Sequence, residues 1–224
     1  MDVATESRRS GVSCRARGAF SLVELLVVIG IIGILISLLL PSLAAARNHA
    51  RRVQCESNLR SVGQLFYAYA NESRGWLYPP LRGAGKPREE RWPVFVFKPA
   101  KWNPPALLCP SDVEDPAEEH SYIINDHLFE HGIKLGDKLP NRSSSEVILM
   151  GEKRSDYPDY YMDSEATRRR TDYYSRVEPY RHGLKLGSNY LFMDGHVEHQ
   201  NERESLAGVD PWGFPDKSKA QLNE

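Results

Sequence analysis

The strongest feature of the hydrophobic pattern is one apolar run near the N-terminus, residues 20–40, which contains a single charged side chain, Glu24. A helix of this length, at about 1.5 Å per residue, crosses the roughly 30 Å hydrocarbon core of a bilayer. Four arginines precede it within residues 1–19, and such a basic flank normally stays in the cytoplasm while the following chain is translocated. The pattern predicts a transmembrane helix over residues 20–41, with the C-terminal part periplasmic or extracellular.

After this run the pattern changes from apolar on every side to apolar on one side. From residue 55 to residue 69, apolar residues recur at alternating steps of four and three, which is the spacing of one face of a helix. These residues are Cys55, Leu59, Val62, Phe66 and Tyr69. We therefore expect the helix to continue as an amphipathic segment over residues 42–70. Pro41 lacks a backbone donor and is expected to bend or loosen the helix.

Residues 71–209 show short apolar segments between turn residues, which is typical of a small globular head built of strands. The strand candidates are residues 94–97, 106–109, 122–125, 146–151, 190–193 and 196–200. The last two flank Asp194-Gly195, a strong signal for a two-residue type I′ hairpin turn. The predicted fold class is α+β, with the long N-terminal helix packed on a small antiparallel sheet and a flexible tail at 210–224.

The net charge of the chain bears on one class of partner, nucleic acid. The chain carries 29 Lys and Arg against 30 Asp and Glu, a formal net charge of −1. Without residues 1–19 the charge becomes −3, because that segment has four arginines and two acids. A net acidic chain gives no electrostatic reason to expect binding to nucleic acid.

Three cysteines are present, and Cys14 lies within residues 1–19, which leaves Cys55 and Cys109 in the rest of the chain. Two thiols delivered to an oxidising compartment usually form a disulfide, and their sequence spacing is not that of a zinc site. Cys55 lies on the apolar face of the predicted helix, where a segment that carries Cys109 can reach it. We predict a disulfide between them, and two separately buried thiols are the alternative.

Glu24 is the unusual residue of the apolar run, because a carboxylate in hydrocarbon costs several kcal/mol, by most estimates, unless it is paired. Cleavage just before Phe20 would create a new α-amino group four residues upstream of Glu24. A neighbouring copy, shifted along a stack of helices, could bring that amine to the carboxylate. The apolar segment would then serve as a membrane anchor in the monomer and as a packing surface in a polymer.

A short motif marks the start of the apolar run: Gly18-Ala19-Phe20-Ser21-Leu22-Val23-Glu24. With its basic leader and with Pro41 inside the helix, it resembles the class III signal of type IV pilins and type II secretion pseudopilins. In that family a prepilin peptidase and methyltransferase cuts on the cytoplasmic side and methylates the new N-terminus. The subunits are single-pass proteins of the inner membrane, and an assembly platform there joins them into a filament.

The resemblance implies that residues 1–19 are a leader peptide and that Phe20, Glu24 and Pro41 serve assembly. A glycine usually precedes the cut, but the cut after Ala19 is favoured because it keeps Glu24 fifth in the mature chain. A cut after Gly18 stays open. A secretory signal peptide or an uncleaved anchor is the alternative, although a secretory apolar region is usually about 7–15 residues long.

The C-terminal half carries a second group of segments. They are residues 109–112, 121–125, 148–152 and 181–197, the last of which holds His182 and Asp194-Gly195. They resemble the pilin-like proteins described as prepilin-type processing-associated with an H-X9-DG domain. Here eleven residues, instead of nine, separate His182 from Asp194, so a fixed geometry between the two side chains stays open.

We expect no enzymatic activity. A histidine oriented by a carboxylate can act as a general base, but no nucleophile or oxyanion motif accompanies His182 and Asp194. Hard oxygen ligands that could suit calcium lie at Asp112, Asp115, Glu152 and Asp194. No loop has calcium-ligand spacing, so turn caps are the simpler interpretation, and no metal or other cofactor is predicted.

The segment 157–180 mixes tyrosines with arginines, a combination that can stack on sugars or on single-stranded nucleic acid. Tyrosines packed over a small core are the simpler interpretation.

The sequence predicts a structural subunit of a pilus-like or pseudopilus-like filament, in contact with membrane lipid and with other subunits. The alternative is a membrane-anchored binding module for polysaccharide that does not polymerise.

Overall fold

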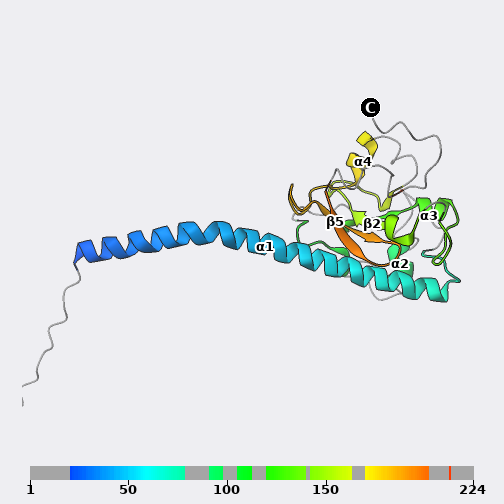
Figure 1. Ribbon diagram of the computed structural model, residues 1–224, viewed down its shortest axis with the longest axis horizontal. Coiled ribbons are helices and arrows are strands. Elements are labelled where there is room, and N and C mark those ends of the chain that lie inside the picture. The colour runs from blue at the N-terminus through cyan, green and yellow to red at the C-terminus, as the bar shows by residue number, and fades with distance from the viewer. Residues whose placement is uncertain are drawn as a thin grey trace, which may run out of the picture. The chain divides into compact units, whose positions relative to one another are not determined.

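The structure is a computed structural model that describes residues 21–78, 91–97, 105–112, 120–139, 142–162, 170–201 and 212. The chain divides into two compact units, residues 1–44 and 45–224. Helix α1 (Leu22–Glu72) forms the described part of the first unit and continues into the second (Figure 1). The predicted fold class is confirmed: a long N-terminal helix and a small C-terminal sheet form an α+β, pilin-like fold.

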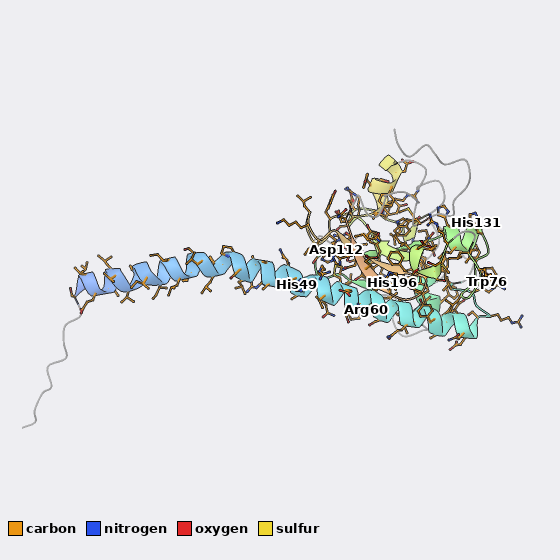
Figure 2. The ribbon with its side chains drawn as sticks, viewed as in Figure 1. His49, Arg60, Trp76, Asp112, His131 and His196 are labelled. Atoms are coloured by element: carbon orange, nitrogen blue, oxygen red, sulfur yellow. A yellow bond between two sulfur atoms is a disulfide. The ribbon has the colours of Figure 1, made fainter. Side chains whose placement is uncertain are left out.

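In the first unit, α1 exposes its apolar side chains on all sides (Figure 2). Large apolar residues from Leu22 to Leu43 are 45% to 73% exposed, and Pro41 lies within the helix. By its length and composition, the helix is able to cross a membrane. A helix that is apolar all round is stable when lipid or other helices cover it.

In the second unit, the apolar stripe predicted on α1 is buried. Cys55, Leu59, Val62 and Phe66 have no exposed surface, and Tyr69 is partly buried against the same core. The neighbouring side chains on the other face of the helix are exposed, among them Arg60, which Figure 2 labels. Burial on one face and exposure on the other is what the spacing of four and three residues predicts.

The sheet has five strands in the order β3-β1-β2-β4-β5. Their bounds are β1 Tyr122–Asn125, β2 Ile148–Glu152, β3 Tyr161–Met162, β4 Ser188–Phe192 and β5 Val197–Gln200. Neighbours in that order are antiparallel except β3, which pairs parallel to β1. The sheet is therefore mixed, whereas an antiparallel sheet was predicted. The two-residue strand β3 is too short for its sequence to show the alternation that marks a strand.

Two predicted strands are wrong. Residues 92–97 form helix α2 (Trp92–Phe97), and Pro105–Leu107 is a 3-10 turn, η2. In α2, Trp92, Pro93 and Val96 are buried. A strand would direct the adjacent residues Trp92 and Pro93 to opposite faces, whereas one turn of a helix can place all three toward the core. The Trp92 ring stacks on Phe66 at 5.2 Å. Pro105 has no backbone donor for a ladder and prefers the φ of a helical turn.

Three further short helices occur in the described part of the chain, and none of them was predicted; the predicted strand 146–151 began at Glu146, which is the last residue of one of them. They are α3 (His127–Glu130), η4 (Ser144–Glu146) and α4 (Arg170–Arg176). Each has seven residues or fewer, so an apolar period of 3.6 residues has too few repeats to be recognised in the sequence.

The hairpin between β4 and β5 forms where it was predicted, but with another turn. The N–H of Gly195 donates to the carbonyl of Phe192, and the N–H of Phe192 donates to the carbonyl of His196, both at 3.0 Å. Gly195 has a φ of +91°, whereas Asp194 is not among the non-glycine residues with positive φ. A type I′ turn needs positive φ at both central residues. The connection is instead a three-residue turn that closes with a left-handed glycine.

Strands β1 to β4 are buried on both faces of the sheet. One face packs with the buried stripe of α1 in the main core, and the other holds a smaller cluster around Ile123, Tyr190 and Trp212. Trp212 is fully buried, and its carbonyl accepts a hydrogen bond from the side chain of Asn125 at 2.8 Å. It is the one described residue of the segment 210–224, for which a flexible tail was predicted.

Candidate functional site

The N-terminal part of the candidate site is the start of α1, where Glu24 lies in the first turn. The backbone N–H of Ser21 donates to the Glu24 carboxylate at 3.0 Å, and this is its one hydrogen bond to a described residue. The acid also lies at the positive end of the helix dipole. Gly18, Ala19 and Phe20 lie outside the described residues, so the spacing between Phe20 and Glu24 is known from the sequence alone.

The second part is a buried cluster in the head, at the place where α1 meets the sheet. Cys55 of α1 and Cys109, which follows η2, are joined by a disulfide with their Cα atoms 5.0 Å apart. Both residues are buried. The link joins two segments that are 54 residues apart in the sequence and fixes the chain after η2 to the helix.

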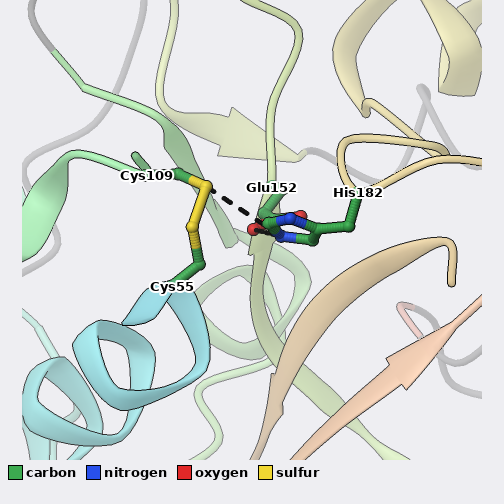
Figure 3. Close-up of side chains that lie close together, drawn as sticks. All are labelled: Cys55, Cys109, Glu152 and His182. Carbon is green, nitrogen blue, oxygen red and sulfur yellow. Dashed lines mark hydrogen bonds and ion pairs between the residues drawn. A yellow bond between two sulfur atoms is a disulfide. The ribbon is translucent and has the colours of Figure 1, made fainter. Parts of the chain in front are cut away.

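His182 and Glu152 lie directly beside this disulfide (Figure 3). Glu152 ends β2, and His182 lies in the loop before β4. The Nε2 atom of His182 is 2.9 Å from Oε1 of Glu152 and 3.9 Å from Sγ of Cys109. Both side chains are fully buried, so each has the other as a hydrogen-bond partner in place of bulk water.

Two neighbouring residues contact the atoms of this pair that point away from the disulfide, Nδ1 of His182 and Oε2 of Glu152. The Nδ1 atom of His182 lies 3.1 Å from the hydroxyl of Ser111, and the backbone N–H of Asn189 donates to Oε2 of Glu152 at 3.0 Å. The buried carboxylate also acts on its neighbours. Burial first, and then the Glu152 carboxylate, raise the pKa of the Tyr122 hydroxyl well above its usual range.

The structure places His182 and Asp194 in separate hydrogen-bond networks. Asp194 lies in the β4–β5 turn, where its Oδ1 atom accepts a hydrogen bond from the backbone N–H of His196 at 3.0 Å and lies 2.5 Å from the imidazole Nδ1 of the same residue. Asp194 is therefore a turn residue, which was the simpler interpretation. The carboxylate partner of His182 is Glu152, and sequence reasoning missed this pair because β2 and the loop before β4 are 30 residues apart.

Gly195 has a steric role in the same turn. A Cβ atom at this position would lie 2.8 Å from the Tyr67 ring, and the Tyr67 hydroxyl donates to the carbonyl of Met193 at 2.8 Å. Burial, and then the nearby Asp194, raise the pKa of Tyr67 to about 12. The Asp-Gly pair thus lets the hairpin approach α1 closely.

The four acids considered as calcium ligands do not form one group among the described residues. Asp112 pairs with Arg181 at 2.8 Å, whereas Glu152 pairs with His182 and Asp194 with His196. Asp115 lies outside the described residues. Within the described part of the chain, the cluster of at least three candidate ligands is Cys55, Cys109, Glu152 and His182.

A polar cleft of about 300 Å³ opens beside the cluster. Its lining is mostly charged and includes Ser111, Arg154, Asp156, Glu178, Tyr180 and Arg181.

Three tyrosines of the segment 157–180 are buried: Tyr160, Tyr161 and Tyr173. These three rings are core residues and are not available to stack on a sugar. The side chains of residues 168–170 lie outside the described part.

Comparison with known families adds one match. The model of the prokaryotic N-terminal methylation motif matches residues 14–40. No curated protein and no solved structure matches the chain.

The matched residues include the motif at residues 18–24, with Phe20 and Glu24. The chain therefore carries a prepilin-type N-terminal signal on a pilin-like fold, with an apolar helix that suits a single membrane anchor. The motif implies processing by a prepilin peptidase and assembly with other pilin-type subunits, which are structural proteins.

Proposed function

We propose that this chain is the precursor of a pilin or pseudopilin. Its mature form is a structural subunit of a type IV pilus-like or type II secretion pseudopilus-like filament. A prepilin peptidase and methyltransferase removes residues 1–19 and methylates Phe20. The head is periplasmic or extracellular and α1 crosses the inner membrane until an assembly platform transfers the subunit to the filament. The head has a structural role and not a catalytic one.

The observation that carries this proposal is Glu24. It is the one charged side chain of an apolar segment that exposes large hydrophobic residues on every side, and it lies within a methylation motif. Its hydrogen-bond partner is the backbone N–H of Ser21, so no basic side chain pairs with the carboxylate among the described residues. A free α-amino group on a neighbouring subunit would supply the opposite charge inside an apolar bundle.

The test is fibre formation by Glu24→Ala in cells, measured in the sheared fraction. We expect no fibres, because the substitution removes the acid that draws in the neighbouring N-terminus. Glu56→Ala is the matched control, since Glu56 lies further along α1 and already pairs with Arg60 of the same helix. Fibres in the control and none in Glu24→Ala support the proposal. Normal fibres in Glu24→Ala contradict it.

The alternative is a membrane-anchored module that binds polysaccharide and does not polymerise. It depended on the tyrosines and arginines of the segment 157–180, and the burial of three tyrosines there weakens it. The two functions differ in the wild-type chain itself. A module of this kind would give no sheared fibres, and Glu24→Ala would leave its binding to polysaccharide unchanged.

A further inference from the structure

The buried cluster contains two groups that a structural disulfide does not require. A disulfide is apolar and is satisfied by apolar neighbours, yet the Glu152 carboxylate and the His182 imidazole are fully buried against it. The desolvation of such a pair costs several kcal/mol per ion before any attraction between them is counted. One candidate ligand atom from each of Cys55, Cys109, Glu152 and His182 lies within 4.8 Å of the others (Figure 3).

We propose that these four side chains bind one Zn²⁺ ion when the disulfide is reduced. Two thiolates, one imidazole and one carboxylate are a donor set that zinc accepts in four-coordinate sites. The thiolates favour a borderline-soft ion, whereas Ca²⁺ and Mg²⁺ prefer oxygen donors alone. Sequence spacing gave no sign of this site, because its ligands come from four separate segments of the head.

The geometry of the imidazole and the carboxylate already approaches that of a zinc site. Tetrahedral coordination places neighbouring ligand atoms about 3.3–3.8 Å apart, given the usual zinc–ligand distances. In the structure, His182 Nε2 lies 2.9 Å from Glu152 Oε1 and 3.9 Å from Cys109 Sγ. Zinc would separate the first pair slightly. Reduction frees the two sulfur atoms to move apart to the separation that two thiolates on one ion require.

The surroundings hold these two ligands as outer-shell partners do in metal sites. Ser111 lies at Nδ1 of His182, which leaves Nε2 directed at the cluster, and the Asn189 N–H holds the outer oxygen of Glu152. Such contacts fix the tautomer and the orientation of ligating side chains. Ser111 also lines the polar cleft of about 300 Å³, so the cleft reaches the residue that contacts Nδ1 of His182.

A dithiol reduces the disulfide by giving up two electrons and two protons and becoming a disulfide itself. A phosphine supplies two electrons and is converted to its oxide by water, which supplies the two protons. Either reaction leaves two thiols. Zinc binding then forms two metal–sulfur bonds and releases the two thiol protons. The ion would join α1, the segment after η2, β2 and the loop before β4. The head would therefore have a covalent link when oxidised and a coordination link when reduced.

The experiment uses the full chain in detergent micelles, titrated with Co²⁺ and then with Zn²⁺ after treatment with a phosphine reductant. We expect one Co²⁺ per chain, with the strong visible absorption of tetrahedral cobalt and a thiolate charge-transfer band, both lost on adding Zn²⁺. The oxidised chain should show neither band. His182→Asn and Glu152→Gln should each weaken zinc binding by about 10-fold or more, because each removes one ligand.

His196→Asn and Glu198→Gln are the matched controls, since they make the same changes at an exposed pair in the same head. They should leave zinc affinity unchanged. The proposal is overturned if the reduced, folded chain binds no Co²⁺, or if His182→Asn binds zinc as tightly as His196→Asn. If reduction unfolds the head, addition of Zn²⁺ should restore its near-ultraviolet circular dichroism, and failure to do so overturns the proposal as well.

Discussion

Removal of the disulfide should strongly destabilise the head. The change is the double variant Cys55→Ala and Cys109→Ala, which removes the cross-link without leaving a single thiol. Both cysteines are buried in the main core, and replacing each by alanine removes its sulfur atom without adding a polar group. We expect the native fold to survive, because the rest of the buried stripe on α1 still covers the sheet.

The size of the effect follows from the length of the loop that the disulfide closes. Its ends are 54 residues apart in the sequence. In the chain-entropy treatment of cross-links, a closed loop of this length lowers the entropy of the unfolded chain enough to stabilise the native state by about 4 kcal/mol at 25 °C. Two small cavities left by the sulfur atoms would add to the loss. We therefore expect the free energy of unfolding to fall by about 4 kcal/mol.

The assay is urea unfolding of the full chain in detergent micelles, followed by tryptophan fluorescence of the head, with a metal chelator present throughout. Trp92 and Trp212 are buried and will report loss of the core. Addition of a reductant to the wild type should produce a loss similar to that of the double variant, and should have no effect on the double variant itself. Cys14→Ala is the matched control and should change nothing.

A double variant that unfolds at the same urea concentration as the oxidised wild type would refute this reasoning. So would peptide mapping without reductant that recovers Cys55 and Cys109 as free thiols.

Two other positions give predictions of the same kind. Gly195→Ala should destabilise the head by about 1–3 kcal/mol, because alanine is strained at a φ of +91° and its Cβ meets the Tyr67 ring. Gly183→Ala tests the backbone strain alone, since Gly183 has a φ of +101° and no neighbouring atom where the Cβ would lie. An equal loss of stability in both variants would exclude the steric effect of Tyr67. Burial raises the pKa of Tyr161 to about 12, so the unfolded chain loses this proton first and stability should fall as the pH rises from about 10 to 12. Tyr161→Phe should reduce that fall in urea unfolding series, and an unchanged pH dependence would contradict the assignment.

The helix was predictable because its pattern is long. The apolar run over residues 20–40 and the stripe over residues 55–69 each contain many positions that agree with one pattern. The buried residues Cys55, Leu59, Val62 and Phe66 are those that the spacing selected. Strands β1, β2, β4 and β5 were also found, because turn residues mark their ends.

Short elements were predicted less well, for physical reasons that α2 illustrates. Val94 and Phe97 have side chains that favour strands, but the core position of Trp92 against Phe66 requires a helical turn there. Local preference is a small free energy that packing of a large ring overrides. Strand β3 is likewise defined by its pairing with β1 and not by a local pattern, since it has only two residues.

The buried cluster could not be derived from the sequence, because its partners are far apart in the chain and are brought together by the tertiary structure. Glu152 and His182 are brought together by the pairing of β2 with β4. Sequence reasoning named both residues, but it considered Glu152 as a calcium ligand and His182 with Asp194. Strand register decides such pairings, and no hairpin turn joins β2 to β4 whose length could set that register.

The most direct test of the filament account is mass spectrometry of the N-terminus of the protein isolated from cells. The account predicts a chain that begins at Phe20 and carries one methyl group on its α-amine, so that Glu24 is the fifth residue. A protein that still begins at Met1, or one that begins beyond Glu24, would contradict it.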